Sequence, residues 1–308
     1  MSEPLEIIFS EDGNIFYQEL ASRIATACEE ISYPAKLRSA QEIERLAKED
    51  LQERVAVLVM PSECLISVGN SREFLSAVAS AKKRILLLAE AMEDKWWEAQ
   101  FQLPVEYDAF VDVGFVSQEE KTASLSAPYH FLFDGPTEPQ RRVLERGVSS
   151  EKRSIPWTLV GNMGEGRAEL LMDLIEEVNP GGFVFLPKAH ARRRQAILEK
   201  THWMLSPSEL SRVLKHTRYY VWCSRHSFKY YESFRFIEAL LAGAVPCKIV
   251  GEDFWKETDV PCIFSSVEDF GKRIRSVGFD RMFQSSRDYY LSWGLLSEHL
   301  RKVLDDVL

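Results

Sequence analysis

Short apolar runs alternate with segments of helical spacing along the first half of the chain. Such runs are typical of strands buried on both faces, as in a parallel sheet. They are LEIIFS (5–10), RVAVLVM (54–60), RILLLAE (84–90) and YDAFVDVGF (107–115). Between them, 14–30 and FLSAVASA (74–81) place apolar residues on one helical face. Strands that alternate with helices predict a parallel sheet with crossover connections.

This rhythm is lost over 116–156, a stretch rich in Ser, Pro and acidic residues, so we place a domain boundary near 145–155. The pattern then begins again, with strands predicted at 156–162, 182–187, 219–224 and 244–250 and helices at 166–178, 206–217 and 266–277. A further helix begins near Ser233 or Phe234 and ends at Gly243. In the tail 287–308, one face of a single predicted helix carries Tyr290, Trp293, Leu296, Leu300, Val303 and Leu304.

The pattern therefore predicts an α/β protein of two Rossmann-like domains, residues 1–150 and 151–286, followed by a helix over 287–308. In open parallel sheets, ligands bind outside the carboxyl ends of the strands. Two such domains facing across a cleft would place a ligand between those ends.

Composition is that of an ordinary globular protein. Of the 308 residues, 45% are hydrophobic and 28% are charged, and no apolar run reaches the roughly 18 residues that span a bilayer. The start MSEPLEIIFSEDG has neither the basic nor the apolar region of a signal peptide. Five scattered cysteines without a CxxC motif suit reduced thiols. We therefore expect a cytoplasmic protein with no transmembrane segment; its oligomeric state stays open.

Charge is spread unevenly along the chain, whose net charge is −9. Residues 1–150 hold 26 Asp and Glu against 15 Lys and Arg, whereas the rest of the chain holds 21 against 23. Within 186–235, 11 Lys and Arg stand against three acids. A basic island in an acidic protein points to an anionic ligand. The alternative is a solvated face whose charge is balanced elsewhere in the fold.

The segment 219–250 carries the strongest candidate chemistry: a strand, the polar loop RHSFKYYE and a helix. In a parallel sheet this loop lies at the strand's carboxyl end, which places Arg225 and Lys229 beside a helix N-terminus that already favours anions. Arg235 and Glu238 share a face of the helix. A guanidinium there suits a diphosphate, and the carboxylate suits a pair of sugar hydroxyls. Alternatively, Glu232 and Glu238 only complement the helix dipole and pair with Arg235 on a solvated face.

A glycine-containing loop follows the strand at 156–162. LVGNMGEGR (159–167) has the strand, glycines and helix of a phosphate loop, but its spacing matches neither the dinucleotide fingerprint nor the Walker motif. Gly161, Asn162 and Arg167 are candidates for phosphate contact, and a flexible turn is the alternative. Arg167 at a helix start opposes the dipole unless an anion or an acid lies nearby.

Both segments resemble one family. ESFRFIEALLAGAVPCKI (232–249) looks like the nucleotide-sugar segment of the GT-B glycosyltransferases, where a glutamate is followed by a small-residue helix, Gly and Pro. It is most similar to the exostosin-like and CgeB-like groups, with a further likeness to α1,3-fucosyltransferases. WTLVGNMGEGR (157–167) is similar to the opening of their C-terminal domain. The resemblance covers about 150–265, and the N-terminal half matches only in architecture.

The resemblance implies that residues 1–150 bind an acceptor, that 151–286 bind a nucleotide-sugar donor, and that the helix 287–308 crosses back to the first domain. Glu238 matches the family's ribose-binding glutamate, and Arg225, Lys229 and Arg235 fall where diphosphate contacts are expected. The candidate donor-binding residues are Arg225, Lys229, Tyr230, Glu232, Ser233, Arg235, Glu238, Gly161, Asn162 and Arg167.

The resemblance also implies an enzyme that needs no metal and no other cofactor. The chain has no DxD motif of the kind that holds a metal. It departs from the family at one place: many retaining members carry two glutamates eight residues apart, whereas Glu232 and Glu238 are six apart. The stereochemical outcome therefore stays open.

The catalytic base is sought among loops after strands of the first domain. An inverting transfer needs a carboxylate or His to deprotonate the acceptor hydroxyl. Glu11 and Asp12 after the first strand are best placed, and Glu90 is next; Asp12 before Gly13 is also ordinary turn chemistry. With Arg235 to stabilise the leaving group, Asp12 and Glu11 make up the candidate catalytic set.

We therefore expect a glycosyltransferase that moves a sugar from a nucleotide-diphosphate sugar to a hydroxyl of an unknown acceptor: a glycan, a protein or a small molecule. Two alternatives stay open. Aromatic residues interleave the basic island, as in single-strand nucleic-acid binding or modification, although the net charge of −9 argues against a nucleic-acid partner. The chain would instead be an inactive, glycosyltransferase-like partner subunit if the first domain lacks a base.

Overall fold

The computed structural model describes residues 4–46, 51–92, 99–100, 104–147, 153–161, 167–186, 205–223, 230–250 and 259–308. The chain divides into two compact units. Unit 1 consists of Met1–Pro139, Tyr230–Glu232 and Trp293–Leu308, and unit 2 of Gln140–Lys229 and Ser233–Ser292. The chain therefore passes between the units four times. Among the described helices, none is long and apolar enough to cross a membrane.

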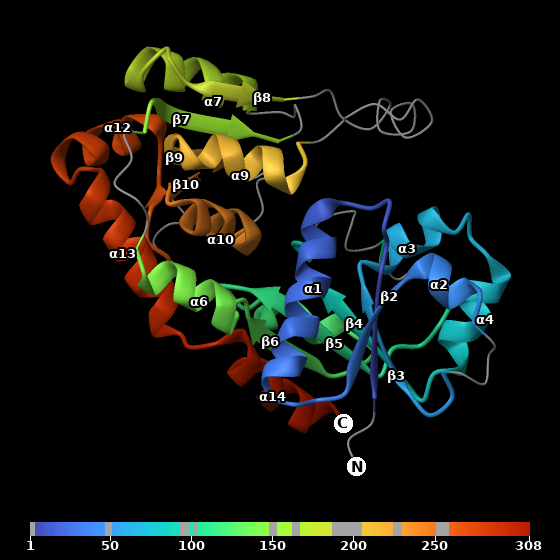
Figure 1. Ribbon diagram of the computed structural model, residues 1–308. Coiled ribbons are helices and arrows are strands. Elements are labelled where there is room, and N and C mark those ends of the chain that lie inside the picture. Colours follow the sequence, from blue (N-terminus) through green and yellow to red (C-terminus); the bar gives the residue numbers. More distant parts are fainter. Residues whose placement is uncertain are drawn as a thin grey trace. The chain divides into compact units, whose positions relative to one another are not determined.

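Unit 1 is built on a six-stranded parallel sheet with the order β2-β1-β3-β4-β5-β6 (Figure 1). The strands are β1 (Leu5–Phe9), β2 (Ala35–Ser39), β3 (Val55–Val59), β4 (Lys83–Leu88), β5 (Ala109–Gly114) and β6 (Tyr129–Phe133). The four central strands are the ones that the apolar runs predict. The sequence does not predict β2 and β6, the two edge strands. An edge strand is less enclosed, so β2 keeps exposed residues such as Lys36 and Leu37 and shows no continuous apolar run.

Helices cover both faces of this sheet. α1 (Ile15–Glu30) and α14 (Leu296–Val307) lie side by side on one face, and α2 (Ala40–Glu44), α3 (Pro61–Ser67) and α4 (Arg72–Ser80) cover the other (Figure 1). Alternate strand residues point to opposite faces. Ile7 and Val57 therefore pack with α1, whereas Ile8 and Leu58 pack with the helices of the other face. A 3-10 helix, η2 (Glu119–Ser124), precedes β6, and α6 (Glu138–Glu145) follows it.

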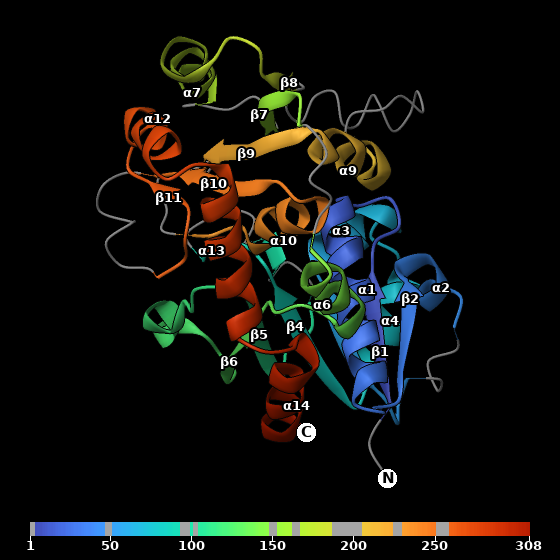
Figure 2. The same ribbon diagram turned by 60° about the vertical axis from the view of Figure 1, so that its left-hand side comes forward.

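Unit 2 is built on a five-stranded parallel sheet with the order β11-β10-β9-β7-β8. The strands are β7 (Ile155–Val160), β8 (Phe183–Phe185), β9 (Thr217–Cys223), β10 (Val245–Ile249) and β11 (Ile263–Phe264). Figure 2 shows α7 (Arg167–Asp173) and α12 (Val267–Ser276) on one face and α9 (Pro207–Lys215) and α10 (Ser233–Ala242) on the other. α7 continues into a π-helical turn, η3 (Leu174–Val178). With two parallel α/β units, the predicted fold class is confirmed.

One arginine fastens the ends of α9 and α10. Arg153, just before β7, donates from Nη1 to the carbonyls of Leu214 and Lys215, both at 2.9 Å, and from Nη2 to the carbonyl of Ala242 at 3.0 Å. The last carbonyls of a helix have no intrahelical partner and carry partial negative charge. Arg153 therefore ties the C-terminal ends of both helices to the start of β7.

The tail of the chain forms two helices, so the prediction of a single helix over 287–308 is wrong. α13 (Phe279–Ser292) ends before Trp293, and α14 begins at Leu296. Gly294 lies between them with φ +85°, a left-handed conformation that favours glycine and interrupts a right-handed helix. The apolar face of α14, including Leu300 and Val303, packs in the core of unit 1.

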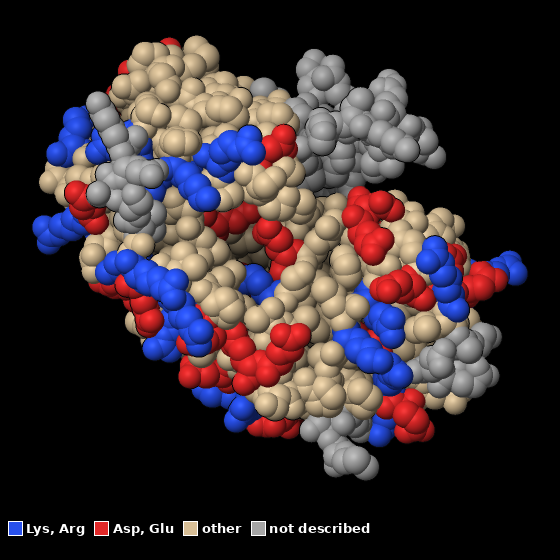
Figure 3. All heavy atoms as spheres, in the orientation of Figure 1, with Lys and Arg blue, Asp and Glu red and all other residues tan. Residues whose placement is uncertain are grey.

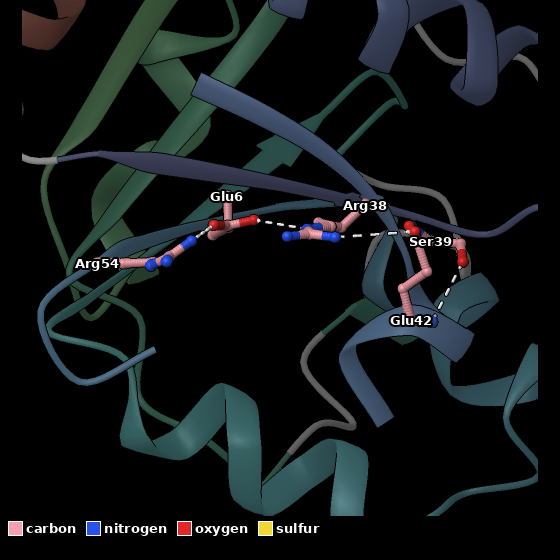
Figure 4. A network of polar contacts seen from close by, with 5 residues as sticks. All are labelled: Glu6, Arg38, Ser39, Glu42 and Arg54. Atoms are coloured by element: carbon pink, nitrogen blue, oxygen red, sulfur yellow. Dashed lines mark hydrogen bonds and ion pairs between the residues drawn. The ribbon is translucent and has the colours of Figure 1, made fainter. Parts of the chain in front are cut away.

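A buried carboxylate joins three strands of unit 1 (Figure 4). Glu6 in β1 is 0% exposed and contacts Arg54, which precedes β3, through Oε1. Its Oε2 accepts a hydrogen bond from Nε of Arg38 in β2 at 3.3 Å. Arg38 also lies 3.8 Å from Glu42, whose backbone N–H bonds to the N-cap side chain of Ser39. Glu6 is therefore neutralised by one arginine from β2 and by one from the residue just before β3.

A second buried acid lies at the other end of the same sheet. Asp112 in β5 is 1% exposed and accepts hydrogen bonds from the hydroxyl of Tyr129 at 2.8 Å and from Nε2 of Gln118 at 3.3 Å. Burial raises the pKa of Asp112 to about 6, although the bonds from Tyr129 and Gln118 and the charge of Lys121 lower it. The folded protein therefore holds this proton more tightly than an unfolded chain, where an Asp titrates near 3.8.

Because the pKa of Asp112 is raised, we expect the folded protein to lose stability between pH 4 and pH 6. In this window the unfolded chain gives up the proton while the folded chain keeps it, so the free energy of unfolding falls as the pH rises. A pKa difference of about two units corresponds to about 3 kcal/mol. Denaturant unfolding at pH 4, 5, 6 and 7 should show this fall reduced in Asp112→Asn. The control Asp305→Asn, exposed on α14, should keep it; an unchanged profile in Asp112→Asn would contradict the assignment.

Candidate functional site

Buried charged side chains line the carboxyl ends of β7 and β9 in unit 2. Arg235 lies in the first turn of α10 and is 6% exposed. Its Nη1 donates to the carbonyl of Val160, the last residue of β7, at 2.8 Å and to the hydroxyl of Tyr220 in β9 at 2.6 Å. The guanidinium carbon lies 5.8 Å from the centre of the Tyr220 ring. Two strands therefore hold this guanidinium in place, and Arg235 is not on a solvated face.

A second guanidinium reaches the same place from α7. Arg167 is the first residue of α7, is 5% exposed, and donates from Nη2 to the carbonyl of Cys223 at 3.4 Å. A Cβ atom on Gly161, which follows β7, would lie 2.7 Å from Nη1 of Arg167 and 3.3 Å from Nη2 of Arg235. The absence of a side chain at Gly161 is therefore what lets both guanidiniums approach the end of β7.

The electrostatics of this group favour an anion. Two guanidiniums that are both removed from water repel each other, and negative charge nearby offsets that repulsion. Glu238, half-buried one turn after Arg235 on α10, supplies one negative charge. Burial raises the pKa of Tyr220 to about 12; Arg235 and Arg167 lower it, and Glu238 raises it. Tyr220 is thus within reach of all three charges, and one carboxylate against two guanidiniums leaves these four residues with a net positive charge.

The residues just before α10 divide between the two units. Ser233 starts α10 in unit 2 and is 3% exposed. Tyr230 and Glu232 belong to unit 1. Burial raises the pKa of Tyr230 well above its ordinary value, and the charge of Glu90 raises it further. The structure therefore brings Gly161, Arg167, Arg235 and Glu238 together and places Tyr230 near an acid of unit 1.

Three predicted donor-binding residues, Arg225, Lys229 and Asn162, lie outside the described residues. Of the predicted catalytic residues in unit 1, Glu11 and Asp12 are both exposed in the turn between β1 and α1. Asp12 accepts a hydrogen bond from Nε2 of Gln41 at 3.1 Å.

The sequence did not reveal a more buried carboxylate at the carboxyl edge of the unit 1 sheet. Glu63 is 7% exposed in the first turn of α3, directly after β3. The sequence does not predict α3, because the helix is short and follows the strand without a loop. A signal was present: Pro61 stands at the first helical position, followed by an acidic residue in the first turn.

Within the described parts of the chain, no three His, Cys, Asp or Glu side chains gather closely enough to hold a metal ion.

Comparisons with known proteins match this chain by structure only. No family model and no curated protein matches its sequence. An α-glucosyltransferase solved in complex with UDP is 11% identical, with a TM-score of 0.65 over 99% of this chain and 100% of that chain. The same figures hold for an α-glucosyltransferase in complex with UDP and a 13-mer DNA that contains a central A:G mismatch. At this identity the likeness concerns the fold, and the chain has the predicted fold of the GT-B glycosyltransferases.

Proposed function

We propose that this protein is a glycosyltransferase that moves a sugar from a nucleotide-diphosphate sugar to an acceptor hydroxyl without a metal. The observation that carries the proposal is the meeting of two buried guanidiniums, Arg167 and Arg235, at Gly161. They lie at the carboxyl edge of a parallel sheet, where ligands of such sheets bind. A chain with the same fold over nearly its full length has been solved with UDP.

In this proposal, Arg167 and Arg235 compensate the charge of the diphosphate. When the bond between the sugar and the diphosphate breaks, the electron pair stays with the diphosphate, and fixed cations stabilise the charge that develops. We also propose that Arg225 and Lys229 supply further positive charge and that Ser233 and Asn162 contact the donor. Glu238 accepts hydrogen bonds from the paired hydroxyls of the ribose.

The further assignments of unit 1 are proposals of the same kind. Tyr230 and Glu232 contact the donor, and Glu11 or Asp12 deprotonates the acceptor. Since a structural neighbour is an α-glucosyltransferase, we propose a hexose as the sugar. We also propose that the protein acts in the cytoplasm.

The acceptor we propose is a glycan, a protein or a small molecule. A neighbour has been solved with DNA, but residues 1–150, the proposed acceptor side, hold 26 acids against 15 bases. On the face drawn in Figure 3, Lys and Arg side chains lie among Asp and Glu side chains. A surface that follows a phosphate backbone needs a continuous excess of positive charge. The charge distribution therefore gives no support to a nucleic-acid acceptor.

Nucleotide binding tests the proposal directly. At 100 times its dissociation constant, a nucleotide that binds only the folded protein adds about 2.7 kcal/mol to the free energy of unfolding. Thermal unfolding with UDP-, GDP-, dTDP- and CMP-linked sugars should show one class that raises the melting temperature by several degrees. Inorganic pyrophosphate should do so more weakly, because it lacks the nucleoside.

Release of nucleotide from the same donor, with water as acceptor, separates an enzyme from an inactive partner subunit. Binding with slow hydrolysis supports the proposed enzyme. Binding without any turnover favours the inactive subunit, and the absence of stabilisation by every nucleotide sugar contradicts a donor site.

A further inference from the structure

A cluster of polar side chains lies at the carboxyl edge of the unit 1 sheet. It consists of Ser10 after β1, Glu63 after β3, Glu90 after β4, and Tyr17 from α1. The hydroxyl of Tyr17 donates a hydrogen bond to Oε1 of Glu90. Burial raises the pKa of Tyr17 well above its ordinary value, and the charges of Glu90 and Glu63 raise it further. Tyr17 is therefore close to both carboxylates, which lie in the segments that follow the neighbouring strands β3 and β4.

The backbone of Gly13 lies against two members of this cluster, Glu63 and Ser10. A Cβ atom on Gly13 would lie 2.3 Å from Oε2 of Glu63 and 3.0 Å from Oγ of Ser10. The same Oε2 accepts a hydrogen bond from the backbone N–H of Asn14 at 2.6 Å. The carboxylate of Glu63 and the hydroxyl of Ser10 therefore both face the backbone of the turn that starts α1.

The hydroxyl of Ser10 has hydrogen-bonding capacity that a ligand would satisfy. Ser10 is 4% exposed, and no described residue forms a hydrogen bond with its Oγ. Buried hydroxyl groups are nearly always hydrogen-bonded, because a hydroxyl that loses its hydrogen bonds to water without gaining others raises the free energy of the folded state. Glu90 is half-buried, so the cluster is partly exposed to solvent. A ligand bound here would meet two carboxylates and a serine hydroxyl.

We propose that this cluster, the Ser10–Glu90 site, binds neighbouring hydroxyls of a carbohydrate acceptor. Adjacent sugar hydroxyls each donate one hydrogen bond and accept others, which matches carboxylates that accept and a serine hydroxyl that does both. The inference rests on the proposed function, since it names the acceptor class of that transfer as a sugar. Glu90 contacts one hydroxyl, Ser10 and Glu63 bind its neighbour, and Tyr17 positions Glu90.

The site can be tested by binding, without turnover. The amide signals of Gly13 and Asn14 report on the cluster, because the Asn14 N–H bonds to Glu63. In NMR titrations of the full chain with UDP present, the methyl α-glycosides of glucose, galactose, mannose and N-acetylglucosamine serve as probes. We expect at least one to shift both amides saturably. Glu90→Gln and Ser10→Ala should each weaken that binding about tenfold, and the matched control Glu29→Gln, exposed on α1, should not.

Stability separates a binding role from a structural role of Ser10. Ser10→Ala removes a hydroxyl that has no partner among the described residues, so its melting temperature should stay level or rise while sugar binding falls. A melting temperature that falls together with binding assigns Ser10 to the scaffold and overturns its role here. Gly13→Ala, which displaces Glu63, should also weaken binding.

The outcomes distinguish this inference from the proposed function. If UDP binds and none of the four glycosides shifts Gly13 or Asn14, the Ser10–Glu90 site is refuted and the glycosyltransferase proposal stands. If no nucleotide binds, the proposed function fails whatever the sugars do. Sugar binding that is lost in Glu11→Gln or Asp12→Asn but retained in Glu90→Gln also overturns the inference, because the exposed acids would then be the contacts.

Discussion

Arg235→Met is expected to raise the dissociation constant for the nucleotide diphosphate about 100-fold. The guanidinium is buried and held by Val160 and Tyr220, so it loses little conformational entropy when an anion binds it. Removing one partner of a buried, hydrogen-bonded charge pair costs about 2–5 kcal/mol, and each 1.4 kcal/mol corresponds to a factor of ten. Isothermal titration with UDP on the wild type and the variant measures the effect.

The same substitution also removes two hydrogen bonds of the fold, so stability must be measured beside affinity. Leaving the Val160 carbonyl without this donor costs about 1–3 kcal/mol, which lowers the melting temperature. Tyr220→Phe removes only the hydroxyl contact and should weaken UDP binding by less than about tenfold.

The matched control for Arg235 is Arg218→Met. Arg218 is exposed on β9 within the same basic island, and its guanidinium lies over the Tyr219 ring at 5.7 Å. The net charge changes equally, so UDP affinity should stay within about threefold of the wild type if the site is local. Equal losses in both variants would show that general positive charge, and not the geometry at Gly161, binds the nucleotide.

Glu6→Gln is expected to lower the free energy of unfolding by about 4 kcal/mol. Glu6 is fully buried and faces two arginines that are 28% and 29% exposed. Removing one partner of a buried ion pair leaves uncompensated charge in a poorly hydrated place, at a cost of about 3–5 kcal/mol. Chemical denaturation at pH 7 gives the difference between wild type and variant.

Glu145→Gln is the control for this effect. It breaks the i,i+4 pair between Arg141 and Glu145, whose side chains are 46% and 49% exposed. Exposed pairs of this kind contribute about 0.3–0.5 kcal/mol, so the two variants should differ about tenfold in effect. If Glu6→Gln changed the free energy of unfolding by less than about 1 kcal/mol, water would have to reach this carboxylate when only the edge of the sheet unfolds.

The strands that could be predicted from the sequence are those enclosed by strands on both sides and by helices on both faces. β1, β3, β4 and β5 have neighbours on both sides and helices on both faces, so nearly every residue must be apolar and the run is visible. β2 and β6 have a neighbour on one side only, which relaxes that demand. The break at Gly294 was hidden because the apolar spacing on either side of it stays helical.

The candidate site was only partly readable from sequence. Arg235 and Glu238 stand out because charged residues interrupt a helix of small apolar residues, and Arg167 because it opposes the dipole of the helix it starts. What holds Arg235 could not be predicted, since strand alternation shows which face Tyr220 occupies but not which backbone carbonyl ends beside it. Glu63 was not identified as a site residue because the helix that carries it, α3, was not predicted.

The four passages of the chain between the units determine how the protein can be dissected. A fragment that stops at residue 139 would lack α14, whose Leu296, Leu300, Val303 and Leu304 fill the core of unit 1. Such a fragment would expose the apolar residues that α14 covers and should aggregate when expressed alone. A soluble half-molecule instead requires α14 to be spliced onto residue 139 by a short linker, which Leu296 N–H, bonded to the Pro136 carbonyl at 2.9 Å, shows to be within reach.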